Sequence, residues 1–424
     1  MEEMTRELFP GVRLTTIRTD RFHSGYFNVQ LLRPLHSSDV SRNALLPSVL
    51  SRGTRTMPDQ AKISDALDSL YGSSLEPGIR QLGETLAIGF QSVFPDDRFL
   101  PGAADCLERI VAMSGEMLLD PATRGGLLRD DYVRSEGQNL HDRIEAAVNN
   151  KRGYARKRAR ELMFEGEAFG VYPLGEAEDA LRIRYQALTK FYREALRTSA
   201  IELFYCGSAG HERVEESVRR AFMTLPGGGE RLLPETELRT EERELRFVAE
   251  EMDVEQGNLV MGFRWHRSGL ADYPALAVFN ELYGGGDNSR LFLNIREDRS
   301  LCYAVGSSVE RYKEVMFVAA GIDFDKREET QEAILAELSD LARGNISSDE
   351  LETARRSVAS AYLQGLDNPA SVCEFRLGQN LLGSGGDLRQ YAALAAEVRA
   401  EDVAKIASEM EPQLSYFLRG EAEE

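Results

Sequence analysis

The chain has 424 residues, more than one hydrophobic core usually organises, so two domains of about 200 residues each are expected. Its residues are 42% hydrophobic and 29% charged, as in ordinary globular proteins, and its formal net charge is −19. An acidic chain is repelled by phosphate backbones and anionic lipid surfaces, which argues against nucleic acid and membrane partners.

The N-terminus and the cysteines favour a cytoplasmic protein. Acidic residues stand where a secretory signal would carry basic ones, and no apolar run of about 18 residues predicts a transmembrane helix. The widely spaced cysteines form no CxxC pair and are predicted to be buried free thiols. They are Cys106, Cys206, Cys302 and Cys373.

The first half of the chain predicts strands and helices in a definite order. A strand over Ser24–Pro34 precedes an apolar, helix-like run that ends at Gly53. Two strands around a charged turn near Glu84 come next, followed by helices with apolar residues at three- and four-residue steps. A further helix and strand end this half near Gly207.

The same order returns after residues 226–244, whose glycine, proline and glutamate content predicts an exposed linker. A strand over Gln256–His266 precedes an apolar run ending at Gly284, and two strands around a turn near Glu314 follow. This weak repeat indicates two units, 1–225 and 245–424. Each is predicted to be α+β, with a mostly antiparallel sheet covered by helices.

Three consecutive glycines, Gly284, Gly285 and Gly286, form the first candidate site. They lack the lysine of a P-loop and the strand-to-helix setting of a dinucleotide-binding loop, so nucleotide binding is disfavoured. The pattern favours a helix C-cap and a loop that needs positive φ.

Metal binding and nucleophilic catalysis find little support. His141 and Glu145 lie at i,i+4 on one predicted helix face, but a catalytic zinc needs three protein ligands and a water. Cys302 is predicted on a strand, where a buried thiol is favoured over a nucleophile. The histidines, which include no pair at zinc-binding spacing, are His23, His36, His141, His211 and His266.

Arg296 and Tyr303 are the remaining candidates. Arg296 lies near the end of a predicted short helix, and Tyr303 lies on the strand that follows. Two such donors could converge on one peptide carbonyl, as oxyanion stabilisation requires. Spacing alone nevertheless favours a surface arginine and a core tyrosine.

The stretch YGGGDNSRLFLNIREDRSLCYAVG, residues 283–306, resembles the second-half signature of the pitrilysin/insulinase family of zinc metallopeptidases. The resemblance covers essentially the whole chain and is strongest over this stretch. It implies two homologous halves that face each other like a clam shell. It also implies that Arg296 and Tyr303 bind the substrate backbone and stabilise the tetrahedral intermediate, with the Gly284–Gly286 run allowing a peptide to approach closely.

The chain departs from this family where zinc should bind. The resemblance places the family's HxxEH motif on Ala44-Leu45-Leu46-Pro47-Ser48, and none of these residues can supply a ligand or the base. Pro47 occupies the glutamate position, which predicts that the helix begins near Asn43. The third ligand position falls near Arg143, whose charge would repel zinc.

These departures imply no zinc or other cofactor on this chain and no hydrolysis by it alone. The pattern is similar to small bacterial members, including a Bacillus-type cytoplasmic pair, in which one subunit carries the zinc motif and its partner the arginine–tyrosine pair. The expected partners are a zinc-bearing homologous subunit, forming a heterodimer, and a peptide that adds as a strand to a sheet edge. Two alternatives stay open: a scaffold or peptide-binding protein of the same fold with no part in proteolysis, and a homodimeric peptide-binding protein.

Overall fold

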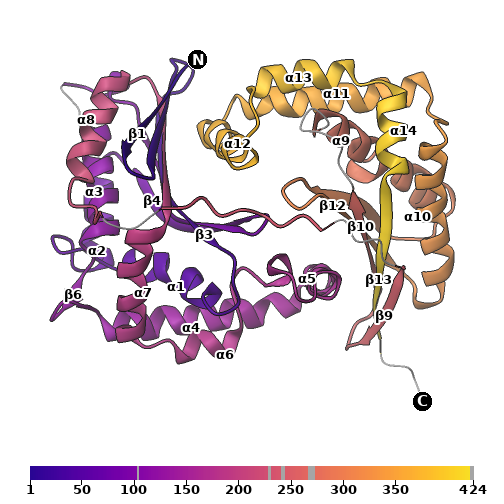
Figure 1. The fold of residues 1–424 in the computed structure, drawn as a ribbon, viewed down its shortest axis with the longest axis horizontal. Helices are drawn as coiled ribbons and strands as arrows, with labels where there is room; N and C mark the ends of the chain where they lie inside the picture. The colour runs from indigo at the N-terminus through magenta and orange to yellow at the C-terminus, as the bar shows by residue number, and fades with distance from the viewer. Residues whose placement is uncertain (103–104, 228–230, 240–243, 266–272, 421–424) are drawn as a thin grey trace. The chain divides into compact units, whose positions relative to one another are not determined.

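The computed structural model describes residues 1–102, 105–227, 231–239, 244–265 and 273–420. The chain forms two compact units (Figure 1). Unit 1 contains Met1–Glu145, Val171–Glu235 and Leu366–Gly383, and unit 2 contains Ala146–Gly170, Thr236–Gly365 and Ser384–Glu424. The predicted halves are contiguous, whereas each observed unit takes one segment from the other half of the sequence. Parts of the predicted linker, and His266, lie outside the described residues.

The sheet of unit 1 has the strand order β1-β2-β8-β3-β5-β4. Its strands are β1 (Glu2–Phe9), β2 (Val12–Arg18), β3 (Ser24–Pro34), β4 (Ser74–Leu82), β5 (Thr85–Pro95) and β8 (Ala200–Gly207). The predicted first strand is β3, and the strand pair predicted around Glu84 is the antiparallel β4–β5 hairpin. Because β2 and β8 run parallel, the sheet is mixed and not uniformly antiparallel.

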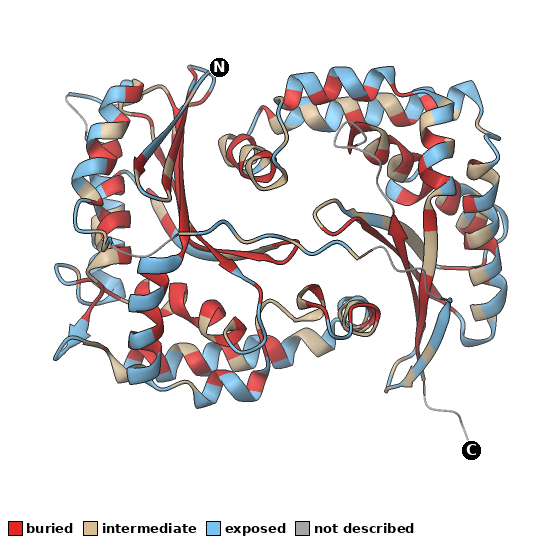
Figure 2. Ribbon diagram, in the orientation of Figure 1, coloured by how far each residue is buried: buried red, intermediate tan, exposed pale blue. Residues whose placement is uncertain are grey.

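Helices cover this sheet and bury their apolar sides, as Figure 2 shows. They are α1 (Val40–Leu50), α2 (Gln60–Asp68), α3 (Cys106–Leu119), α4 (Asp130–Ala146), α6 (Ala177–Arg182), α7 (Tyr185–Thr198), α8 (His211–Ala221) and α12 (Pro369–Leu382). In α7 the buried Leu188, Phe191 and Ala195 recur at helical spacing. The late helix α12 is capped by Asn368, ends at the left-handed Gly383, and contacts β3 and β8.

The sheet of unit 2 has the order β11-β12-β10-β13-β9. Its strands are β9 (Arg246–Glu251), β10 (Gly257–Trp265), β11 (Ala304–Glu310), β12 (Val315–Ile322) and β13 (Met410–Arg419). This order matches β4-β5-β3-β8-β2 of unit 1, including one parallel pair, here β13 and β9. The shared topology is what the sequence repeat predicts, and both sheets are mixed.

The helical segments of unit 2 are α5 (Lys151–Met163), α9 (Tyr273–Asn280), η5 (Glu281–Gly285), η6 (Leu291–Asp298), α10 (Arg327–Ala342), α11 (Ser348–Gly365), α13 (Leu388–Glu397) and α14 (Ala400–Ser408). The helix α5 comes from the first half of the sequence. Its Ala155, Ala159 and Met163 pack in one buried cluster with Val260 of β10 and Leu414 of β13. This apolar contact explains why the segment belongs to unit 2.

A charged cluster lies inside unit 2. Glu167, which follows α5, accepts from the Arg264 guanidinium at 2.7 Å and lies 2.9 Å from the Lys313 ammonium. The side chains of Glu167 and Lys313 are completely buried. Lys313 also donates to the Glu237 carbonyl at 2.5 Å. The cluster therefore connects Glu167, Glu237 and Lys313, which are far apart in the sequence, to the sheet of unit 2 through Arg264 of β10.

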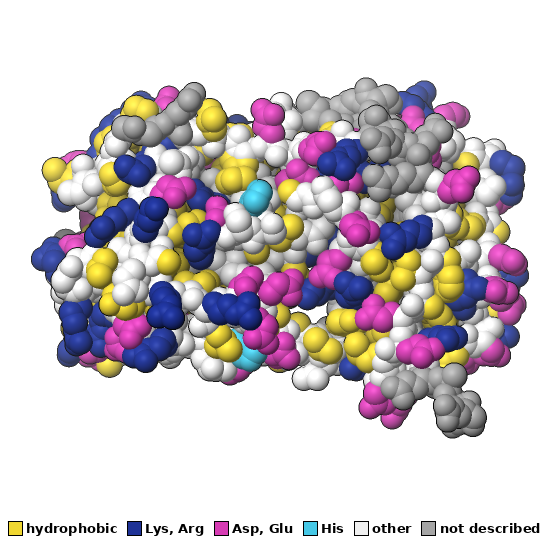
Figure 3. Space-filling model, turned by 60° about the horizontal axis from the view of Figure 1, so that its bottom comes forward, with side chains coloured by type: hydrophobic (Ala, Val, Ile, Leu, Met, Phe, Trp, Pro, Cys, Tyr) yellow, Lys and Arg dark blue, Asp and Glu magenta, His cyan; other side chains and the backbone are white. Residues whose placement is uncertain are grey.

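Within the described residues, the helices are all too short or too polar to cross a membrane. All four cysteines are buried and free, as predicted. On the face shown in Figure 3, basic and acidic side chains are interspersed over the surface. That face carries no continuous basic stripe of the kind that nucleic acid binding requires.

Candidate functional site

The glycine run packs closely against its surroundings. At Gly284, a Cβ atom would lie 2.7 Å from Leu291 Cδ1 and 2.8 Å from the Ser307 backbone nitrogen. At Gly285 and Gly286, it would lie 2.9 Å and 3.0 Å from the Glu281 carboxylate. None of the three has positive φ, so the predicted left-handed cap is wrong. Close contact with the β11 backbone excludes a side chain at Gly284, and the Asn280 carbonyl restricts Gly285, whereas the flexible Glu281 side chain beside Gly286 could move.

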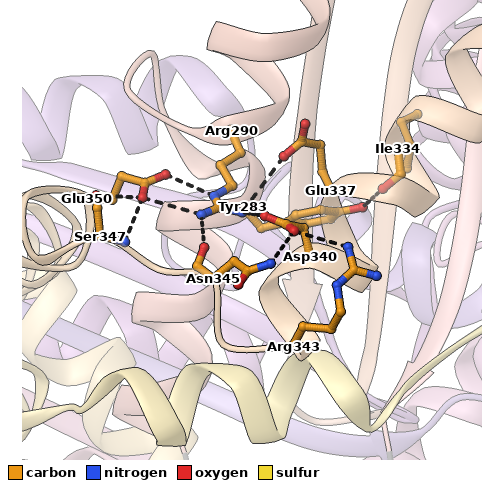
Figure 4. A network of polar contacts seen from close by, with 9 residues as sticks. All are labelled: Tyr283, Arg290, Ile334, Glu337, Asp340, Arg343, Asn345, Ser347 and Glu350. Atoms are coloured by element: carbon orange, nitrogen blue, oxygen red, sulfur yellow. Dashed lines mark hydrogen bonds and ion pairs between the residues drawn. The ribbon is translucent and has the colours of Figure 1, made fainter.

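Arg290, the arginine of the Ser-Arg-Leu-Phe segment, anchors the motif (Figure 4). Its guanidinium donates to Glu350 Oε1 and Asp340 Oδ2, each at 2.9 Å, and to the Asn345 carbonyl. Burial lowers the pKa of Arg290, but its hydrogen bonds to these carboxylates outweigh that effect and raise it. Beside it, the buried Tyr283 hydroxyl donates to the Ile334 carbonyl at 2.9 Å.

Sequence reasoning did not single out Arg290. Its carboxylate partners lie 50 and 60 residues later in the chain, on or beside α10 and α11. Short-range spacing contains no signal for such a network. The network holds the start of η6 in place and thereby positions the residues that follow it.

Arg296 and Tyr303 are both accessible. The Arg296 side chain is 39% exposed, lies 3.6 Å from Glu297, and stacks over the Phe292 ring at 4.6 Å. Tyr303 is 60% exposed, so the expectation of a core tyrosine is wrong. Its hydroxyl donates to Asp323 Oδ1 at 2.9 Å, and this hydrogen bond raises the pKa of Tyr303 above its ordinary value.

The two side chains make no direct contact in the structure's described residues. The charge of Arg296 acts on the thiol of Cys302, the residue before Tyr303. Burial raises the pKa of Cys302 to about 11, against the opposing effect of the Arg296 charge. The thiol is therefore protonated at neutral pH and unsuited to nucleophilic attack.

Cys302 and Tyr303 lie just before the edge strand β11, so the prediction that they lie on the strand is wrong. The Tyr303 backbone N–H donates to the Gly321 carbonyl at 2.8 Å, and the next residue, Ala304, begins β11. Within the described strands, β11 pairs only with β12. No strand among the described residues pairs with its other side.

The positions expected for zinc ligands lie on two helices of unit 1. Ala44 and Pro47 are buried on α1 and Ser48 is half-buried, while Arg143 is exposed on α4. The helix α1 begins at Val40 and contains Pro47 in its interior, so the predicted start near Asn43 is wrong. Buried apolar packing of α1 outweighs the backbone hydrogen bond that proline removes.

These residues do not fit a zinc ion, since they offer no imidazole, thiolate or carboxylate ligand. In the part of the chain that the structure describes, no group of three His, Cys, Asp or Glu side chains could hold a metal ion. His141 and Glu145 on α4 thus remain a pair at most. No step of a reaction is assigned to a metal on this chain.

The chain is similar in sequence to proteins described as inactive peptidases. Residues 182–358 match the family model described as "Peptidase M16 inactive domain", a range that includes Arg296 and Tyr303. A Bacillus subtilis protein named "Probable inactive metalloprotease YmfF" is 28% identical over 413 residues, which cover 97% of this chain and 96% of the relative.

Solved structures show the same fold at low identity. A conserved protein from Enterococcus faecalis has a TM-score of 0.89 at 23% identity and covers 100% of this chain and 99% of its own. The peptidase M16 inactive domain from Pseudomonas fluorescens has a TM-score of 0.81 at 15% identity, with 100% and 99% covered. The chain thus has an M16-like α+β fold.

Proposed function

We propose that this chain is the non-catalytic, substrate-binding subunit of a two-chain peptidase of the pitrilysin/insulinase family. A homologous zinc-bearing subunit would be its partner and would supply the metal chemistry. This chain would supply Arg296 and Tyr303 as hydrogen-bond donors to the peptide. The clam-shell arrangement of the two halves belongs to the same proposal.

The exposure of Arg296 and Tyr303 carries this proposal. Arg290 directs its donors to Asp340, Glu350 and the Asn345 carbonyl. Among the described residues, Arg296 by contrast has a 3.6 Å ion pair with its neighbour Glu297 and a ring contact with Phe292. Tyr303 offers its phenol at the surface beside the open edge of β11. The match to an inactive-domain family and the zinc-incompatible residues at positions 44–48 support the same function.

The part of this chain in the reaction is binding and charge stabilisation. A peptide added along β11 would pass Tyr303 with its backbone hydrogen-bonded to the strand. Its carbonyl would compete with Asp323 for the Tyr303 phenol proton, while the Arg296 guanidinium would neutralise developing negative charge on the oxygen. The lack of a side chain at Gly284 lets η5 pack against Ser307 of β11.

The test is co-expression of this chain with a zinc-bearing homologue encoded beside it, followed by a peptide-cleavage assay. We expect cleavage only with both chains present. Arg296→Ala and Tyr303→Phe should each lower the rate by about 10² to 10³, the usual effect of removing a transition-state donor. Arg299→Ala is the matched control, because Arg299 is exposed just after η6.

Equal cleavage by the zinc-bearing chain alone would overturn the proposal and favour a scaffold role. Unchanged rates in both variants would also overturn it, because the pair would then have no part in the reaction. A homodimer of this chain that binds peptide without any partner would support the remaining alternative.

A further inference from the structure

A pocket of about 400 Å³ lies in unit 2, next to the start of β11. Its floor consists of adjacent positions on three neighbouring strands, where Gly321 of β12 pairs with Ala304 of β11 and with Asn258 of β10. Two positions along, Gly306 pairs with Ala319 on the same face of the sheet. These small residues leave the strand backbones open to a ligand.

The wall of the pocket is the first part of α5, the helix contributed by the first half of the sequence (Figure 1). Arg152 and Arg156 lie at i,i+4 on one face of this helix, and both line the pocket. Arg152 reaches over the floor, because a Cβ on Gly321 would lie 3.4 Å from its Nη2 atom.

These two arginines differ from the other cations of α5. Arg158 donates to Glu161 at 2.6 Å and to Glu250 at 3.1 Å, and Lys157 lies 3.6 Å from Glu161. Arg152 and Arg156, by contrast, are exposed and have neither an ion pair nor a hydrogen bond to any side chain that the structure describes. Two like charges side by side repel each other, and a bound anion would remove that repulsion.

The chemistry of the pocket selects its ligand. Two guanidinium groups present planar forks of N–H donors, which match a carboxylate better than any neutral group. The chain as a whole is acidic, with a net charge of −19, so an acidic ligand needs local positive charge of this kind to bind. Asn258, only 6% exposed, adds a buried amide to the floor. The small residues of β11 and β12 beside Asn258 leave room for the extended backbone of a peptide.

We propose that this pocket binds the side-chain carboxylate of a glutamate or aspartate in the peptide, close to the residue held at Tyr303. The inference rests on the proposed function, because it assumes that a peptide lies along β11. It deepens that function by naming the substrate class: peptides with an acidic residue near the position of cleavage. Gly321 connects the two sites, since its carbonyl accepts from the Tyr303 N–H and its Cα faces Arg152.

The test uses the full chain and two fluorescein-labelled peptides of about ten residues that differ only in one central glutamate or glutamine. We expect the glutamate peptide to bind at least tenfold more tightly in fluorescence anisotropy, the lower end of what a charge-assisted hydrogen bond contributes. Arg152→Gln and Arg156→Gln should each abolish this preference and leave the glutamine peptide unaffected. Arg299→Gln is the matched control on an exposed arginine outside the pocket.

The outcomes separate this inference from its premise. Equal binding of the two peptides, or a preference that survives both arginine substitutions, overturns the inference. If the inference fails but the two-chain enzyme still cleaves the glutamine peptide in an Arg296-dependent way, the proposed function remains supported. If neither peptide binds and neither is cleaved, both fail. Displacement of the glutamate peptide by millimolar inorganic phosphate, with no glutamate preference, would reduce the pocket to a general anion site and also overturn the inference.

Discussion

The buried charge cluster of unit 2 makes a sharp prediction about stability. Glu167→Gln removes a carboxylate that pairs with both Arg264 and Lys313. These cations are 4% and 0% exposed, so they cannot recover the lost interaction from water. Removing one partner of a buried pair costs about 3–5 kcal/mol, because the remaining charge stays buried. With a urea slope of about 2 kcal/mol/M, the unfolding midpoint should fall by about 1.5–2.5 M.

The chain contains a convenient probe for this measurement. Its single tryptophan, Trp265, is buried in β10 next to Arg264, so tryptophan fluorescence reports the unfolding of unit 2. Glu165→Gln is the matched control, because Glu165 is exposed and lies 3.5 Å from Arg246 at the surface. That change should alter the free energy of unfolding by less than about 0.5 kcal/mol. Equal midpoints for the two variants would refute the reasoning.

Two further measurements would show that the loss of stability in Glu167→Gln comes from the buried charge cluster. Adding Lys313→Met to Glu167→Gln should cost less than the two single changes together, because both remove the same interaction. Burial alone would raise the pKa of Glu167, but the hydrogen bond and charge of Lys313, with the charge of Arg264, hold it below its ordinary value. The stabilisation is therefore complete above about pH 4.3, the value for an unfolded glutamate, and is lost as pH falls through the lower folded value.

Three other outcomes are expected. Gly284→Ala should destabilise unit 2 by about 1–3 kcal/mol in urea unfolding, since the new Cβ would lie 2.7 Å from Leu291 Cδ1, whereas Gly385→Ala, which meets no atom within 4 Å, should have little effect. Asp323→Asn should lower the pKa of Tyr303 toward its ordinary value. This pKa is measured by ultraviolet titration, as the difference between chains with and without Tyr303→Phe. An unchanged pKa would show that Asp323 does not cause the raised pKa of Tyr303. The four buried cysteines should resist a thiol reagent at pH 7 and react fully after unfolding, and rapid labelling of the folded chain would contradict their burial.

Local periodicity predicted much of the fold. The strand predicted at Ser24–Pro34 has the bounds of β3. Its residues are buried almost continuously, without polar–apolar alternation, because both faces of this strand are covered. The sequence repeat predicts two units of the same architecture, because strands and helices follow one another in the same order in both halves of the sequence. What periodicity could not predict is which sheet an amphipathic helix covers. The segment 146–170 joins unit 2 through long-range apolar contacts that leave no local signal.

The site was predicted only in part for the same reason. The glycine run marked a close approach, but the φ angle of a glycine depends on its neighbours in space, and here Ser307 and the Asn280 carbonyl set the constraint. Spacing alone favours a core position for Tyr303 and the family resemblance a substrate-binding one, and the structure places it exposed, just before an edge strand. The pocket beside α5 combines distant segments, so spacing along the chain gave no indication of it.

Of the two arginines in the motif, Arg290 contributes to folding, whereas Arg296 is the one proposed to contribute to function. Arg290 is 8% exposed and donates to the half-buried carboxylates of Asp340 and Glu350, so its removal would take away both ion pairs and weaken the fold. Arg296 is accessible, and an exposed pair such as that with Glu297 contributes about 0–1 kcal/mol. A loss of activity on removing Arg290 would therefore be ambiguous. The same loss on removing Arg296, with the unfolding midpoint unchanged, would indicate that its guanidinium acts on a group outside this chain.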